Sequence, residues 1–130
     1  MSLHISPDLV DRVRERRTLN EEEFLKIIQL SLPRAWSIVR GLLEKKICDK
    51  MPGPVVHDPP HMNEETRGEL LRMMASTSIR TAIEDFYGVR LAFQNCHKVG
   101  VFLKSEEREF RGFASPVAQV LNQRPELVDC

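Results

Sequence analysis

The segment from Asn63 to Lys104 constrains the fold of this chain more than any other part of it. Asn63 precedes two glutamates, which is the chemistry of a helix start, and Gly88 stands where a second helix should end, because glycine adopts the left-handed conformation without steric cost. Beyond Gly88, apolar and polar residues alternate on both sides of an Asn-Cys-His-Lys loop at residues 95–98. The segment therefore predicts two helices followed by a β-hairpin.

Helical patterns also precede and follow this segment. Ser6-Pro7 and Asn20 predict the starts of two helices, and Pro33 predicts a third, capped by Ser31, that runs to about residue 50. Ser115-Pro116 predicts a short C-terminal helix, whereas residues 105–112 are charged and are expected to be exposed. We predict a mainly helical α+β fold with four or five helices and one β-hairpin, in the order of a winged helix. The expected core includes Trp36, Ile83, Phe86 and Phe93.

Length and composition favour a single domain over residues 1–130. A chain of 130 residues with 42% hydrophobic residues can build one core, and its 29% charged residues, mixed in sign, are typical of a soluble globular protein. Four prolines and one glycine between residues 51 and 62 exclude a continuous helix there. We expect this segment to be an extended, Pro-rich connection.

The charge balance excludes a strong overall attraction to polyanions. Nineteen basic and nineteen acidic residues leave no net field that would steer the chain to nucleic acid or to an anionic membrane. No run approaches the roughly 20 apolar residues of a membrane span, and no signal-peptide pattern is visible, so we expect a cytoplasmic protein. Cys48, Cys96 and Cys130 are odd in number and irregularly spaced, which favours free thiols.

The winged-helix order raises the possibility of DNA recognition through the second helix of the central segment. Residues 63–112 carry eight basic and eight acidic side chains, and Glu84 and Asp85 would lie on the exposed face of that helix. This segment therefore has no surplus of positive charge with which to neutralise DNA phosphates. The side chains available for DNA contacts are Ser76, Thr77, Arg80, Thr81 and Lys98.

Catalytic and metal sites have weak signals. Zinc would require convergence of Cys48, His57, His61 and either Cys96 or His97. Pro59 and Pro60 exclude a helix that would place His57 and His61 on one face. Two exposed loop histidines and a small buried cysteine are therefore the simpler interpretation. Cys96-His97 could support thiol chemistry, but neighbouring residues on an extended backbone point to opposite sides. We expect no metal, no cofactor and no enzymatic activity.

Apolar residues outside the regular elements favour a protein-interaction role. Two groups are candidate partner-binding residues: Met51, Val55, Val56 and Met62 in the connection, and Phe110, Arg111 and Phe113 near the C-terminus. The first group could instead cover the core of the chain, and the second could anchor the C-terminal helix. We predict a non-enzymatic regulatory or adaptor protein that acts through protein contacts and forms a homodimer. The alternative is a winged-helix DNA-binding transcription regulator.

Two runs, residues 91–102 and 113–123, resemble small soluble proteins of cyanobacterial type. The resemblance covers about a fifth of the chain and contains no catalytic motif. It implies a cytoplasmic accessory or regulatory protein and assigns no role to any residue.

Overall fold

A computed structural model describes residues 2–95 and 98–123, in which helices surround a small antiparallel sheet. The N-terminal helices are α1 (Pro7–Arg16), α2 (Glu21–Ser31) and α3 (Pro33–Leu43), and α3 continues as a π-helical turn, η1 (Glu44–Cys48). Strand β1 (Val55–His57) precedes α4 (Glu64–Ala75) and α5 (Thr77–Tyr87). The hairpin of β2 (Val89–Gln94) and β3 (Lys98–Leu103) is followed by α6 (Glu107–Phe113) and α7 (Pro116–Leu121).

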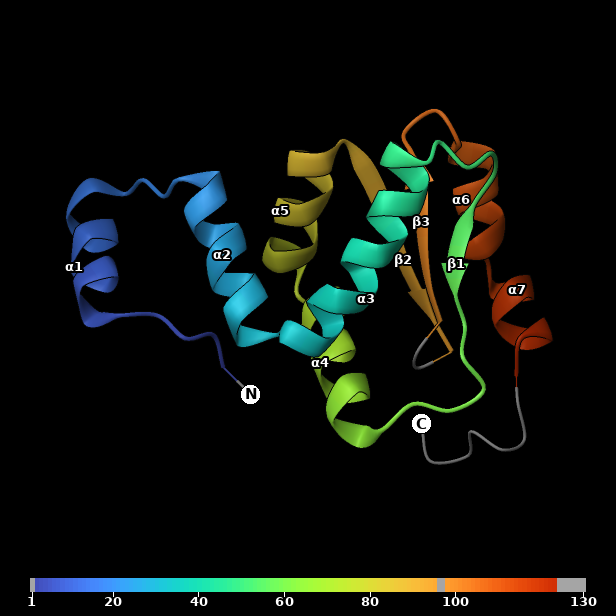
Figure 1. Ribbon diagram of the computed structural model, residues 1–130, viewed down its shortest axis with the longest axis horizontal. Coiled ribbons are helices and arrows are strands. Elements are labelled where there is room, and N and C mark those ends of the chain that lie inside the picture. The colour runs from blue at the N-terminus through green and yellow to red at the C-terminus, as the bar shows by residue number, and fades with distance from the viewer. Residues whose placement is uncertain (1, 96–97, 124–130) are drawn as a thin grey trace.

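The sheet has the strand order β1-β3-β2, with every pair antiparallel. Val55 lies opposite Val101 and Leu91 lies opposite the same residue from the other side. Helices α3, α4 and α5 cover one face of the sheet, and α6 and α7 lie on the other face (Figure 1). Helices α1 and α2 extend the molecule away from the sheet at its N-terminal end (Figure 1).

The core lies between the sheet and the helices α2 to α5. Its fully buried side chains include Ile28, Leu70, Ile83 and Val101. Successive side chains along a strand point to opposite faces of the sheet, so alternate residues of the strands face α6 instead of the core. Phe102 is one of them and is fully buried. Phe110 and Phe113 pack against it edge to face, with ring centroids 5.6 and 5.4 Å from that of Phe102.

Several predicted helix ends are confirmed. The side chains of Ser6, Asn20, Asn63 and Ser115 accept hydrogen bonds from backbone N–H groups in the first turns of α1, α2, α4 and α7. Gly88 ends α5 with φ 67°, in the left-handed region. The predicted hairpin is also present, although its second strand includes Lys98, which was assigned to the loop.

Other expectations need correction. The described residues contain seven α-helices, so the predicted four or five is too low; α6 was missed because its sequence is mostly charged. The Pro-rich connection at 51–62 contains a strand, β1. Phe86 is 41% exposed instead of buried, because Tyr87 takes the place beside Trp36, with ring centroids 6.1 Å apart. Trp36 and Ile83 are buried as predicted, and Phe93 packs against the core while partly buried.

The start of α3 also differs from the prediction. Ser31 does not cap this helix; its hydroxyl accepts the N–H of His4 at 2.8 Å. The buried carboxylate of Glu69 performs this function from α4, because Oε1 accepts the Arg34 N–H at 3.0 Å. A carboxylate at this end of a helix also interacts favourably with the helix dipole.

Candidate functional site

A cleft of about 760 Å³ runs beside strand β2. Its floor is the strand itself, one wall is formed by α5 with the end of α4, and the other wall is formed by α6 and α7. The cleft therefore opens between the two helical layers that sandwich the sheet. This cleft is larger than a hollow on α4 and another on α7, of about 570 and 300 Å³, and more charged side chains line it than line either of them.

The floor of the cleft is the unpaired edge of the sheet. Strand order places β3 on one side of β2 and no described strand on the other. The Leu91 N–H donates to Glu84 Oε2 at 2.9 Å, so this group points away from β3. Because backbone groups alternate in an antiparallel ladder, the N–H and C=O groups of Val89 and Phe93 point into the cleft as well.

The α5 wall is built around Glu84. One carboxylate oxygen accepts from the strand edge, and the other lies 3.7 Å from Nε of Arg80. The guanidinium of Arg80 also donates to the carbonyl oxygen of Met74 at 2.7 Å, at the end of α4. Asp85 lies next to Glu84 and is exposed. This wall therefore presents two carboxylates and one guanidinium.

The opposite wall combines an aromatic ring with two cations. The Arg90 guanidinium lies over the Phe110 ring, 3.7 Å from its centroid, and 3.9 Å from Glu107 Oε1. Lys104 also lines the cleft, is exposed, and has no ion-pair partner among the described residues. Since Phe110 is held against the sheet by Phe102, Arg90 is stacked on a fixed ring.

An amide network holds α7 to the hairpin at the far end of the cleft. The Gln94 side chain donates to the Phe113 carbonyl at 2.7 Å, and Asn122 donates to Gln94 Oε1 at 3.1 Å. Asn122 Oδ1 accepts from the Lys98 ammonium at 3.0 Å, and Asn95 donates to the Asn122 carbonyl. Sequence reasoning missed this network, because a polar side chain gives no signal of a partner so far along the chain.

The candidate partner-binding residues have different environments. Val55 is buried in β1, Met62 packs against the core, and Met51 and Val56 are 46% and 39% exposed. Phe110 and Phe113 anchor α6 on the sheet, and Phe110 also lines the cleft. Arg111 is exposed and pairs with Glu107 at 2.9 Å. Of the seven residues, Met51, Val56 and Arg111 are exposed.

The alternative DNA-contacting residues are engaged within the chain. Ser76 alone separates α4 from α5, and its hydroxyl accepts the Ile79 N–H at 3.4 Å. The Thr81 hydroxyl donates to the Thr77 carbonyl at 2.6 Å. Lys98 lies 3.9 Å from Asp58 in addition to its bond with Asn122. A single residue between helices is also shorter than the three or four residues typical of a helix-turn-helix.

No metal centre emerges from the described residues, which contain no group of three metal-ligating side chains close enough to hold an ion. Cys48 is a free thiol, as predicted. Its side chain is exposed, so the prediction that this cysteine is buried is wrong. His57 is half-buried and His61 is exposed. The predictions on Cys96, His97 and Cys130 fall outside the described residues. In the same described part, no helix combines the length and apolar character needed to cross a membrane.

The most deeply buried charge pair lies outside the cleft. The Lys46 ammonium, 1% exposed, lies 2.7 Å from Glu106 Oε1 and also donates to the carbonyls of Met51 and Gly53. Burial raises the pKa of Glu106, but the bonds from Lys46 and from the Leu103 N–H outweigh it and lower the pKa overall. This pair connects η1 to the start of α6 and is structural.

The whole chain, residues 1–130, matches the model of the family described as NucS shadow ORF. The chain belongs to this family. The name of the family model also carries the prefix KH. Neither the curated proteins nor the solved structures include a match to the chain.

Proposed function

We propose that this member of the NucS shadow ORF family is a non-enzymatic regulatory or adaptor protein that binds a partner protein in the cleft beside β2. The observation that carries the proposal is the unpaired edge of β2, which forms the floor of a cleft of about 760 Å³ between two helical layers. Backbone groups at a strand edge hydrogen-bond readily to another chain. We further propose that the protein works in the cytoplasm and as a homodimer.

The side chains of the cleft support binding more than catalysis. Glu84, Arg80 and Arg90 each contact another group of the chain, and none of them is paired with a nucleophile. A stacked arginine beside a partly buried aromatic ring is a common anchor in protein interfaces. The cleft therefore has the groups of a recognition site.

Nucleic-acid binding has less support. The letters KH in the name of the family model are also the name of a class of RNA-binding modules, in which a GXXG loop clamps the backbone of four nucleotides. No two of the six glycines in this sequence are three residues apart, so the loop is absent. Two carboxylates, Glu84 and Asp85, also line the cleft and would repel phosphates. The winged-helix DNA-binding alternative faces the same objection.

The proposal is tested by affinity capture with tagged protein and a variant that fills the cleft. Ala114→Tyr places an aromatic ring in the cleft from an exposed position that lines it. Val117→Tyr is the matched control, because Val117 is 68% exposed and lies outside this cleft. We expect Ala114→Tyr to lose partners that wild type and Val117→Tyr both retain.

A second pair of substitutions tests the surface predicted from the sequence. Met51→Glu and Val56→Glu alter exposed apolar side chains of the Pro-rich connection without touching the core. If these changes abolish capture and Ala114→Tyr does not, the partner binds at the connection and the cleft proposal is wrong.

A further inference from the structure

We infer that the partner binds as an extended segment that adds a strand to β2 and places an acidic side chain opposite Arg90. This inference rests on the proposed function and specifies the chemistry of the partner. Its support comes from the free strand edge, from the position of Glu84, and from the charges on the α6 wall.

Glu84 occupies the place of a hydrogen-bond acceptor on an added strand. Its Oε2 lies 2.9 Å from the Leu91 nitrogen, in line with the direction in which a neighbouring strand would present a carbonyl. When a partner strand arrives, the carboxylate can move to Arg80, which already lies 3.7 Å from its second oxygen. Glu84 thus protects the edge in the free protein and can be displaced by a partner.

The recessed position of the edge favours a peptide segment over a second copy of the chain. Helices α5 and α6 line the cleft on both sides of β2, so a strand must enter between them. A second β2 carries the same two helical layers, and these would collide with the walls before the strands could pair. An extended segment without flanking helices meets no such obstacle, and strand addition is an established mode of peptide recognition.

Charge selects the residue that faces the α6 wall. The side chains of Arg90 and of the residue opposite it on an added strand share one face of the sheet and lie close together. Arg90 and Lys104 are the cations on this side of the cleft, and Lys104 has no ion-pair partner among the described residues. An aspartate or glutamate at this position of the partner would pair with both.

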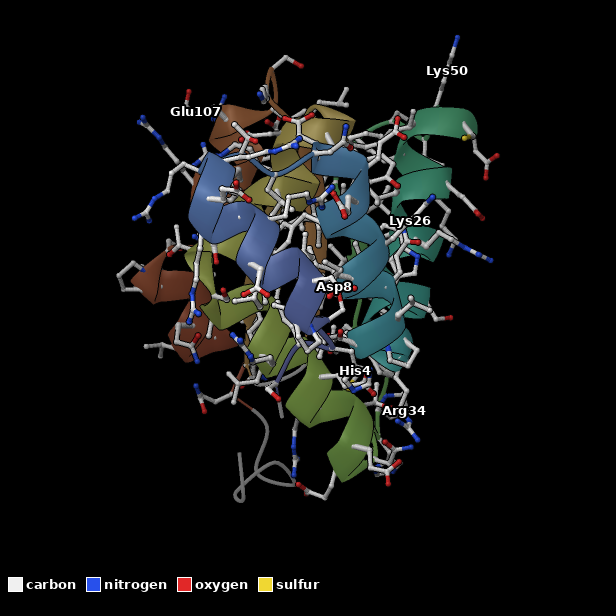
Figure 2. The ribbon with its side chains drawn as sticks, turned by 90° about the vertical axis from the view of Figure 1, so that its left-hand side faces the viewer. His4, Asp8, Lys26, Arg34, Lys50 and Glu107 are labelled. Carbon is white, nitrogen blue, oxygen red and sulfur yellow. The ribbon has the colours of Figure 1, made fainter. Side chains whose placement is uncertain are left out.

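The inference is tested with a phage-displayed library of random 12-residue peptides, selected on the immobilised full chain. Selected peptides are synthesised and titrated into wild type, Lys104→Gln and Ala114→Tyr. Lys50→Gln is the control for loss of a positive charge, because Lys50 and Glu107, the neighbour of Arg90, lie at opposite sides of the molecule (Figure 2).

We expect peptides that alternate apolar and polar residues and share one acidic position. Binding should weaken about 5-fold on Lys104→Gln or on replacing the acid with its amide, as expected for loss of one partly exposed ion pair. It should fall with salt and stay unchanged on Lys50→Gln. Hydrogen exchange at the Leu91 and Phe93 amides should slow when the peptide is bound.

The opposing results separate this inference from the proposed function. Suppose that the selected peptides fail to bind Ala114→Tyr but share no acidic position, or do not slow hydrogen exchange at the Leu91 and Phe93 amides. The inference is then wrong, and the cleft remains a binding site. Peptides that bind Ala114→Tyr as well as wild type, or no peptides at all, overturn both. Binding of a 12-nucleotide oligo-uridine that Ala114→Tyr abolishes would replace the protein partner with nucleic acid.

Discussion

Replacement of Lys46 by methionine should destabilise this protein strongly. The ammonium of Lys46 is 1% exposed and contacts the Glu106 carboxylate and two backbone carbonyls, so its three hydrogens all have acceptors. Methionine keeps the unbranched length but leaves Glu106 without its cation. Removing one partner of a buried ion pair costs about 3 to 5 kcal/mol. Because Glu106 remains 16% exposed, water compensates in part, and we expect a loss of about 3 kcal/mol.

The loss can be measured by chemical denaturation followed through Trp36, which is the only tryptophan and is buried in the core. A decrease of about 3 kcal/mol corresponds to a fall of about 10 °C in Tm for a chain of this size. Lys45→Met is the matched control, since Lys45 lies in the same turn and is exposed. Its stability should stay close to that of wild type.

The pH dependence of the effect follows from Glu106. In wild type the pKa of this carboxyl is lowered, so its contribution to stability is present above the unfolded value of about 4.3 and is lost as pH falls through the folded value. In Lys46→Met, Glu106 stays partly buried but loses the hydrogen bond and the charge attraction from Lys46, so the pKa of Glu106 rises. The stability difference between the two proteins should therefore be largest at pH 7 and shrink toward pH 4. A difference below about 1 kcal/mol at pH 7, or one that does not change with pH, would refute the reasoning.

Four further predictions concern the fold, DNA, metal and assembly. Gly88→Val should cost about 1 to 2 kcal/mol through its φ of 67° alone, whereas Gly112→Ala, in a helix with open space around it, should not destabilise; equal thermal melts would contradict this. Random duplex DNA should bind no tighter than about 10⁻⁴ M at physiological salt; a micromolar, salt-dependent shift lost on Arg80→Ala would reverse this conclusion. Purified protein should carry no stoichiometric zinc by elemental analysis, and a metal lost on His57→Ala or Cys48→Ser would disprove it. Light scattering at micromolar concentration should give about twice the chain mass of 15.0 kDa, through the 51–62 or 110–113 segment; a monomer at all concentrations would exclude the dimer.

The features that sequence reasoning predicted correctly are local. Ser6, Asn20 and Asn63 cap helices through bonds to residues two or three positions ahead, and Gly88 ends α5 by its own backbone freedom. In each case the residue type and its immediate neighbours contain the whole physical cause. The hairpin belongs to the same group, because its two strands are adjacent in the chain.

The features that were missed depend on distant partners. Strand β1 is three residues long and exists because Val55 pairs with Val101, which lies far along the chain. Helix α6 is charged along most of its length and is held by two phenylalanines that pack on Phe102. The spacing of Phe110 and Phe113, three residues apart, was the available signal, but without a known sheet it could not be told from an exposed interface.

Glu84 shows most clearly why the cleft could not be predicted from sequence. In the sequence, Glu84 and Asp85 were interpreted only as two negative charges on the exposed face of a helix, where they oppose DNA binding. Its carboxylate instead lies between Arg80 and the Leu91 N–H, a position that exists only because β3 pairs with the other side of β2. An unprotected strand edge promotes aggregation, and a charge placed on it is a common defence. The same contact keeps the edge accessible to a partner. Glu84 accepts a hydrogen bond from one N–H of β2, so it is displaced more easily than a strand that is hydrogen-bonded along the whole edge.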